Sequence, residues 1–172
     1  MRAGKFSVLN ALGLFGPLVI TLVVYRDALM AGFVFDDHMF LGWWCWQITS
    51  IAELAELPFE TGCTYRPVRY LSLAIDHLLW GLNPAGFHLT NLVMHGVILA
   101  LVYRLLLRMT AHGAAASIAT LLWALHPVHT DVVTYVAGRR DLLFTLFFLI
   151  AYALWPRGPG WQQKWVRLAG SL

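Results

Sequence analysis

Charged side chains are scarce in this chain. Only 12% of its 172 residues are Asp, Glu, Lys or Arg, whereas 59% are hydrophobic, and soluble domains have roughly 25% charged residues. No basic run with interleaved aromatic residues is present, which argues against nucleic-acid binding. Internal repeats, low-complexity tracts and linkers are also lacking. We therefore expect an all-α polytopic membrane helix bundle that forms a single membrane domain over residues 1–172.

Cysteine pairs of the CxxC type are absent as well. The two cysteines, Cys45 and Cys63, fall in one expected outer loop, and the sequence leaves open both a disulfide and two free thiols. His126 and His129 have no third ligand nearby, which is weak support for a metal site. We prefer the simpler interpretation that Pro127 ends a helix and His129 lies in the turn that follows. No metal ligands are predicted and no cofactor is required, although a divalent cation at the acidic residues described below is left open.

Four apolar stretches predict membrane-spanning helices, and they cover residues 6–25, 87–107, 114–127 and 142–155. The first two have the roughly 20 residues that cross a bilayer core of about 30 Å, whereas the last two are short for a full crossing. The first stretch is long for a signal peptide and no clear cleavage site follows it, so we expect an uncleaved span.

An amphipathic helix is predicted on the outer face at residues 68–80. Apolar residues recur there at helical intervals, while Arg69, Ser72 and Asp76 occupy another face. This segment is too short and too polar to cross a bilayer, and we expect it to lie on the membrane.

Charge distribution predicts a cytoplasmic N-terminus. With this orientation seven of the twelve basic residues fall inside and five outside, a mild positive-inside bias. All nine acidic residues then fall outside, which indicates a functional outer face on the periplasmic or luminal side.

Asp36 and Asp37 follow the first span directly and are the candidate catalytic residues. Neighbouring carboxylates at a membrane edge raise each other's pKa, and burial raises it further. Such a group could act as general base on an acceptor hydroxyl or bind a divalent ion. The alternative is an acidic helix end that only marks where the span meets water.

Arginines occur in two candidate phosphate-binding segments. Arg66 and Arg69 flank the start of the amphipathic helix, and Arg139 and Arg140 precede the last span. The planar guanidinium group suits a phosphate. Ordinary headgroup contacts or ion pairs with the acidic loop explain Arg66 and Arg69 equally well. Of Arg139 and Arg140, one could bind phosphate while the other pairs with Asp131 or Asp141 or reaches the headgroups.

Polar residues form one stripe on the second long span. His88, Asn91 and His95 share a helix face by their spacing, and such a face contacts protein or a cavity rather than lipid. We assign donor contacts to His88 at the outer end, and interhelical hydrogen bonding to the deeper His95.

Together, the segments FVFDD, YRPV, GLNPAGFHLTN, ALHPVHTDVV and GRRDLL resemble one family. They are similar, over about residues 32–155, to the N-terminal part of the transmembrane-and-TPR protein O-mannosyltransferases and their bacterial relatives, which are GT-C membrane glycosyltransferases. The resemblance implies a polyprenyl-phosphate or dolichyl-phosphate sugar donor used on the non-cytoplasmic side. It implies Asp36 or Asp37 as base or acceptor-binding residue, and donor-phosphate or structural roles for Arg66, His88 and Arg139.

The resemblance also implies a larger bundle followed by TPR repeats. We therefore expect an incomplete N-terminal portion of a GT-C module, whose partner is the remaining part of a split or truncated enzyme. The expected function is transfer of a sugar to a protein, glycan or lipid acceptor. The alternative is a non-catalytic membrane module that binds lipid phosphates or partner helices.

Overall fold

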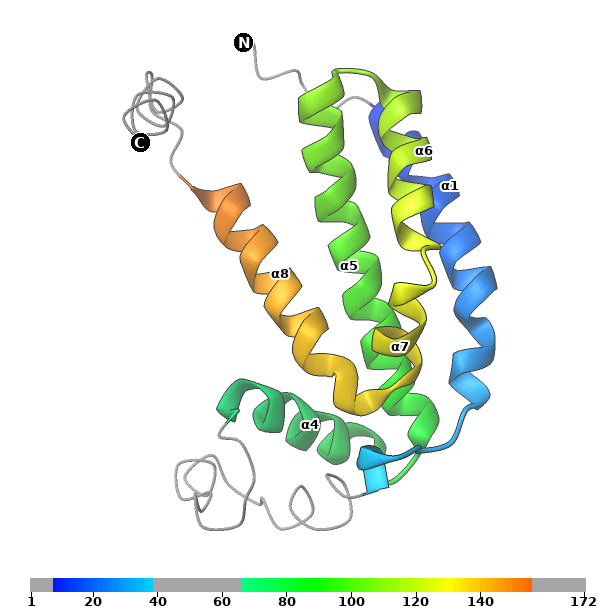
Figure 1. Ribbon diagram of the computed structural model, residues 1–172, viewed down its shortest axis with the longest axis vertical. Coiled ribbons are helices and arrows are strands. Elements are labelled where there is room, and N and C mark those ends of the chain that lie inside the picture. Colours follow the sequence, from blue (N-terminus) through cyan, green and yellow to red (C-terminus); the bar gives the residue numbers. More distant parts are fainter. Residues whose placement is uncertain (1–7, 39–65, 156–172) are drawn as a thin grey trace.

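The computed structural model describes residues 8–38 and 66–155 (Figure 1). Every regular element within these residues is a helix, which confirms the all-α prediction. Cys45 and Cys63, with the disulfide left open above, lie outside the described residues.

Two helices have the length and apolar composition to cross a membrane. The first combines α1 (Val8–Tyr25) with the 3-10 helix η1 (Arg26–Met30), and the candidate span is Leu12–Met30. The second is α5 (Pro84–Thr110), whose 27 residues extend about 40 Å at 1.5 Å per residue. The side chain of Asn83 caps α5 by accepting a 3.1 Å hydrogen bond from the backbone N–H of Ala85.

Shorter helices complete the bundle. α6 (Gly113–Ala124) has 12 residues and α8 (Arg139–Leu154) has 16, fewer than the roughly 20 of a full crossing. Between them lie α7 (Val128–Thr134) and the 3-10 helix η4 (Val136–Gly138). Two of the four expected spans thus have spanning length, and the count of four stays a prediction.

α6 and α7 follow one another along the same side of α5 (Figure 1). The backbone carbonyl of Ala124, which the end of α6 leaves without a helical partner, accepts a 3.3 Å hydrogen bond from the Tyr25 hydroxyl. His129 belongs to α7, where its ring lies 4.2 Å from that of Trp123 and 5.5 Å from that of His95. The break between α6 and α7 is therefore packed by aromatic side chains, and Pro127 precedes α7 at its N-terminal boundary.

Polar side chains are buried in this bundle, and apolar ones cover much of its surface. The buried polar residues are Thr21, Asp37, Arg69, Asp76, His88, Asn91, His95, Thr120 and Arg139. Large apolar side chains are exposed on α1, α5 and α8, among them Phe15, Val93 and Phe144. This distribution fits a bundle surrounded by lipid, where polar groups face protein and apolar groups face the hydrocarbon.

The expected amphipathic helix is α4 (Pro67–Trp80), and it lies across the ends of α5 and α8 (Figure 1). Arg69 and Asp76 on its polar face are buried, whereas Ile75 and Leu78 on its apolar face are exposed. The helix and its two faces agree with the prediction. The polar face is turned toward α5 and α8, where it contributes to the candidate site.

Candidate functional site

The two adjacent aspartates have opposite environments. Asp37 is 1% exposed, whereas Asp36 is exposed at the start of a helical turn over residues 36–38. Phe35, directly before them, has a φ of 45°, in the left-handed region that a non-glycine residue rarely adopts. Strain of this kind is often found at functional sites.

The Asp37 carboxylate accepts hydrogen bonds from three backbone N–H groups. Its Oδ2 atom lies 3.2 Å from the nitrogen of Val34 and 3.4 Å from that of Val136, and its Oδ1 atom lies 2.7 Å from the nitrogen of Ala137. Burial raises the pKa of Asp37, while these backbone hydrogen bonds and nearby His88 oppose the rise. Asp37 thus fastens the segment after η1 to η4.

Asp36 contacts the side chain of Tyr135, which immediately precedes η4. Burial raises the pKa of Tyr135 most, and the nearby Asp36 carboxylate raises it further. The Asp36 carboxylate remains on the surface of the protein, near Tyr135. Of the two aspartates, Asp36 is therefore the one that an external hydroxyl group can reach.

Arg139, at the start of α8, is completely buried. One of its terminal nitrogens, Nη2, lies 2.5 Å from Oδ2 of Asp76 on α4 and donates a 3.0 Å hydrogen bond to the carbonyl of Phe87. Its Nε atom donates to Oδ1 of Asn91 at 2.7 Å, and its Nη1 atom donates to the carbonyl of Ser72 at 3.3 Å. Arg139 therefore joins α4, α5 and α8.

Asp76 receives support from a second side as well. The Thr90 hydroxyl donates a 2.8 Å hydrogen bond to its Oδ1 atom. Burial raises the pKa of Asp76, and the Arg139 charge and the Thr90 hydrogen bond oppose that rise. A buried carboxylate with both oxygens paired is well suited to hold α4 against the bundle.

His88 lies between these two groups. It is fully buried on α5, interacts electrostatically with both Asp37 and Arg139, and faces the backbone of Ala31 and Gly32. Neither ring nitrogen has a partner in good hydrogen-bond geometry among the described residues. His88 therefore connects the Asp37 contacts to the Arg139 contacts at the packed end of the bundle.

Arg66 is half-buried and directly precedes α4. Its backbone carbonyl accepts the N–H of Tyr70 at 3.1 Å, and its side chain has no ion pair or hydrogen bond with a described residue. The structure brings Asp36, Asp37, His88 and Arg139 together. Arg66 starts the helix that Arg139 anchors, and no contact joins its side chain to the four.

Two members of the site are not identified by the sequence patterns. Tyr135 stands in no recognisable motif, and Asp76 is apparent only as part of a polar helix face. A charged residue on a membrane-associated helix requires a partner, and this signal could have paired Asp76 with a buried arginine. The ion pair suggested for Asp141 is present with Arg140, at 3.3 Å on the surface. The described residues contain no group of three or more His, Cys, Asp or Glu side chains placed to hold a metal ion.

The chain is similar to several proteins named protein O-mannosyl-transferases. It is 30% identical to human TMTC3 over 167 residues, which are 82% of this chain and 17% of that protein. Tmtc3 of Drosophila melanogaster is 37% identical over 199 residues, covering 90% of this chain and 20% of that protein. Mouse TMTC4 is 42% identical over 103 residues, covering 52% of this chain and 14% of that protein.

The chain thus spans about a fifth or less of the length of these relatives. No protein-family model and no solved structure matches it. Homology to protein O-mannosyl-transferases extends over most of the chain and supports the family suggested by the sequence motifs.

Proposed function

We propose that this chain forms the acceptor-side part of a membrane protein O-glycosyltransferase of the GT-C type. The enzyme transfers a sugar from a polyprenyl-phosphate donor to a hydroxyl group of a protein on the non-cytoplasmic side of the membrane. The names of the relatives favour mannose as the sugar and protein as the acceptor. Glycan and lipid acceptors are the other acceptor classes that this chemistry allows.

The contrast between Asp36 and Asp37 is the observation that carries the proposal. Asp37 is fixed by backbone N–H groups, and Asp36 is exposed beside Tyr135. Asp36 is therefore the general base, and Asp37 is a positioning residue. In the transfer step the acceptor oxygen bonds to the anomeric carbon, the bond from that carbon to the phosphate oxygen breaks, and the acceptor proton passes to Asp36. The polyprenyl phosphate leaves with the bonding electrons.

Arg66 is the side chain best suited to bind the donor phosphate. Its guanidinium group has no partner among the described residues, and a free guanidinium can hold a phosphate through two parallel hydrogen bonds. Arg139 is a positioning residue, because its donors are already directed to Asp76, Asn91 and backbone carbonyls. His88 lies between Arg139 and Asp37. It holds the Asp37 contacts and the Arg139 contacts in a fixed position relative to each other.

The membrane arrangement follows from the same proposal. α1, α5 and α8 cross the bilayer, and α6 and α7 cross it together as one broken helix, an arrangement found where a helix lines a polar site. The N-terminus is cytoplasmic, and α4 with the aspartates is periplasmic or luminal. The rest of the enzyme, supplied by the same or another polypeptide, completes the donor groove.

The test is sugar transfer in membranes that contain the full chain together with the rest of the enzyme. The membranes are supplied with radiolabelled polyprenyl-phosphate mannose and a Ser/Thr-rich peptide, and labelled peptide is measured. Asp36→Asn is expected to lower the rate by about 10²–10⁴-fold, the contribution of a general base, without changing the unfolding midpoint in detergent. Asp37→Asn is expected to lower both the transfer rate and the unfolding midpoint. Undiminished transfer by both variants contradicts the proposal.

A non-catalytic lipid-phosphate-binding module is the second candidate. The complete engagement of Arg139 with protein groups favours it, because one of the expected phosphate ligands is used for packing. In that case the chain binds labelled polyprenyl phosphate in a manner that depends on Arg66, and no labelled peptide forms at any acceptor concentration.

A further inference from the structure

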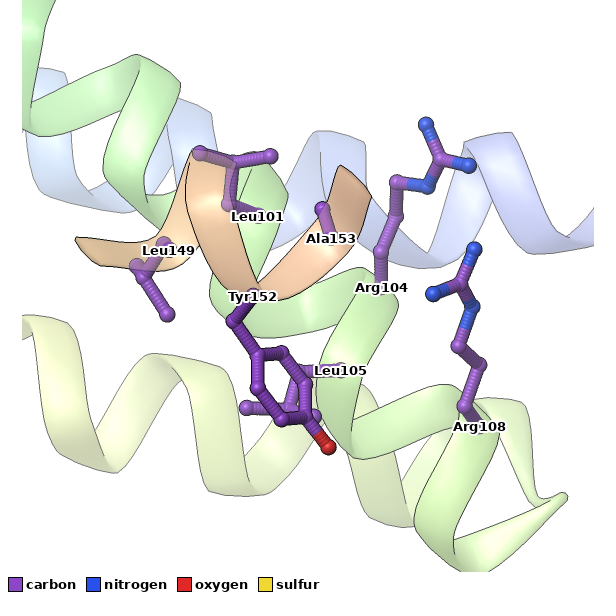
Figure 2. Close-up of a pocket in the computed structure, with 7 residues that line it drawn as sticks. All are labelled: Leu101, Arg104, Leu105, Arg108, Leu149, Tyr152 and Ala153. Atoms are coloured by element: carbon purple, nitrogen blue, oxygen red, sulfur yellow. The ribbon is translucent and has the colours of Figure 1, made fainter. Parts of the chain in front are cut away.

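A second polar site lies at the other end of α5, away from the aspartates. A small pocket there is lined by Leu101, Arg104, Leu105 and Arg108 of α5 and by Leu149, Tyr152 and Ala153 of α8 (Figure 2). The side chains of Arg104 and Arg108 extend in the same direction from successive turns of α5, beside Ala153 (Figure 2). The pocket thus combines two guanidinium groups with an aliphatic wall.

Nothing in the described part of the chain neutralises these two arginines. Both are exposed, and neither forms an ion pair or hydrogen bond with a described residue. The described acidic residues are Asp27, Asp36, Asp37, Asp76, Asp131 and Asp141. All belong to the opposite end of the bundle, in η1, in α4 and around α7 and the start of α8. The pocket therefore attracts anions.

The depth of the pocket matches the boundary between lipid tails and headgroups. α5 is about 40 Å long, so about 5 Å projects at each end from a bilayer core of about 30 Å. Arg104 is six residues, or about 9 Å, from the end of α5 at Thr110. Its long side chain can reach the headgroup level from there, as Arg side chains near helix ends commonly do.

The lining of the pocket favours a lipid over a soluble metabolite, because an aliphatic wall of Leu101, Leu105 and Leu149 adjoins the two arginines. A phosphate group can sit between the guanidinium groups while an acyl chain follows Leu101 and Leu149 into the bilayer. Basic pockets between membrane helices are known to bind anionic headgroups in this manner.

We propose that the pocket between α5 and α8 binds the phosphate headgroup of an anionic phospholipid, with Arg104 and Arg108 as its ligands and Ala153 leaving room for the headgroup. The site is separate from the aspartate site, and it does not depend on whether the chain transfers a sugar. A bound lipid would fill the space between the diverging ends of α5 and α8.

The full chain, purified in detergent, is mixed with phosphatidylglycerol or phosphatidylcholine, and retained lipids are counted by native mass spectrometry. We expect one phosphatidylglycerol to be retained in preference to phosphatidylcholine. Arg104→Gln with Arg108→Gln should weaken retention about tenfold or more, the effect of losing one or more charge-assisted hydrogen bonds. Arg140→Gln, which removes a surface charge at the opposite end, should leave it unchanged.

Ala153→Leu tests the shape of the site with both arginines still present. It should also lower phosphatidylglycerol retention, whereas a purely diffuse electrostatic attraction would not respond to it. Inorganic phosphate at millimolar concentration should fail to displace the lipid, because the acyl chain contributes to binding. Equal retention of the two lipids, or unchanged retention after the double arginine substitution in a protein of unchanged helicity, overturns the proposal.

Discussion

The carboxylate of Asp37 and the backbone N–H of Ala137 form a 2.7 Å hydrogen bond between residues that are 100 positions apart in the chain. The bond fixes the segment that follows η1 to η4, the short helix that precedes α8. Asp36, the residue before Asp37, lies near Tyr135 because the same hydrogen bond positions this segment. Two adjacent aspartates thereby have different environments, one buried and hydrogen-bonded and one exposed.

Burial of Asp37 predicts a distinct pH dependence of stability. Its pKa is raised above the ordinary value of 3.8 by desolvation, so the folded protein holds this proton more tightly than the unfolded chain does. The contribution of Asp37 is therefore most favourable below pH 3.8 and decreases as pH rises through its folded pKa. The unfolding midpoint of the wild-type protein minus that of Asp37→Asn should fall as pH increases from about 4 to about 7.

This difference isolates Asp37, because Asp76 also has a raised pKa and contributes to both proteins alike. The midpoints are measured in the same detergent by loss of helical circular dichroism. A difference that grows with increasing pH would contradict the prediction, because it would mean that the three backbone hydrogen bonds outweigh the cost of burying the charge.

The pair formed by Arg139 and Asp76 predicts strong energetic coupling. Removing one partner, as in Asp76→Leu or Arg139→Met, leaves a buried group without its counterpart and should destabilise the protein by about 3–5 kcal/mol. The combination Asp76→Leu with Arg139→Met removes both charges and should recover much of that loss. Denaturant unfolding of the four proteins in a double-mutant cycle measures the coupling.

Arg140 and Asp141 provide the matched control. Their ion pair of 3.3 Å is half-exposed, with side-chain exposures of 54% and 55%, and such pairs contribute about 0–1 kcal/mol. Coupling of similar size in the two cycles would mean that the buried pair does not hold α4 to the bundle.

Much of the fold was predictable because apolar length and helical spacing report directly on it. The long span α5 and the two faces of α4 follow from the sequence, since a stretch of that length and apolarity has few alternatives in a bilayer. The resemblance to protein O-mannosyltransferases also follows from the sequence, because several motifs occur in a fixed order. The homology agrees with that assignment.

The distribution of roles within the site could not be predicted, because it depends on contacts between distant segments. Adjacency in sequence gives no reason to separate Asp36 from Asp37, and the difference arises from the backbone N–H groups of Val34, Val136 and Ala137, which bind Asp37. The partner of Arg139 is Asp76 on another helix, although an acidic residue much closer in sequence was an equally reasonable candidate. Local patterns identify helices, but they do not specify which charges meet.

Gly13 lies at a tight contact between α1 and its neighbours α5 and α6. A Cβ atom at this position would meet the side chain of Tyr103 and would lie 2.9 Å from the Ser117 hydroxyl oxygen, which itself donates a 2.7 Å hydrogen bond to the Gly13 carbonyl. Gly13→Ala should therefore push α1 away from α5 and α6 and lower the free energy of unfolding by about 1–3 kcal/mol.

Gly16 in the same helix is the control, because a Cβ atom there meets no atom within 4 Å beyond its chain neighbours and its own helix backbone. Alanine has a higher helix propensity than glycine, by about 1 kcal/mol, so Gly16→Ala should leave stability unchanged or raise it. The unfolding midpoints of the two variants in detergent compare the same chemical change three residues apart. Equal stability of Gly13→Ala and Gly16→Ala would contradict the prediction. It would mean that close approach of the helix backbones does not pack α1 against the bundle, and that contacts of the exposed apolar side chains of α1 with lipid hold α1 in place instead.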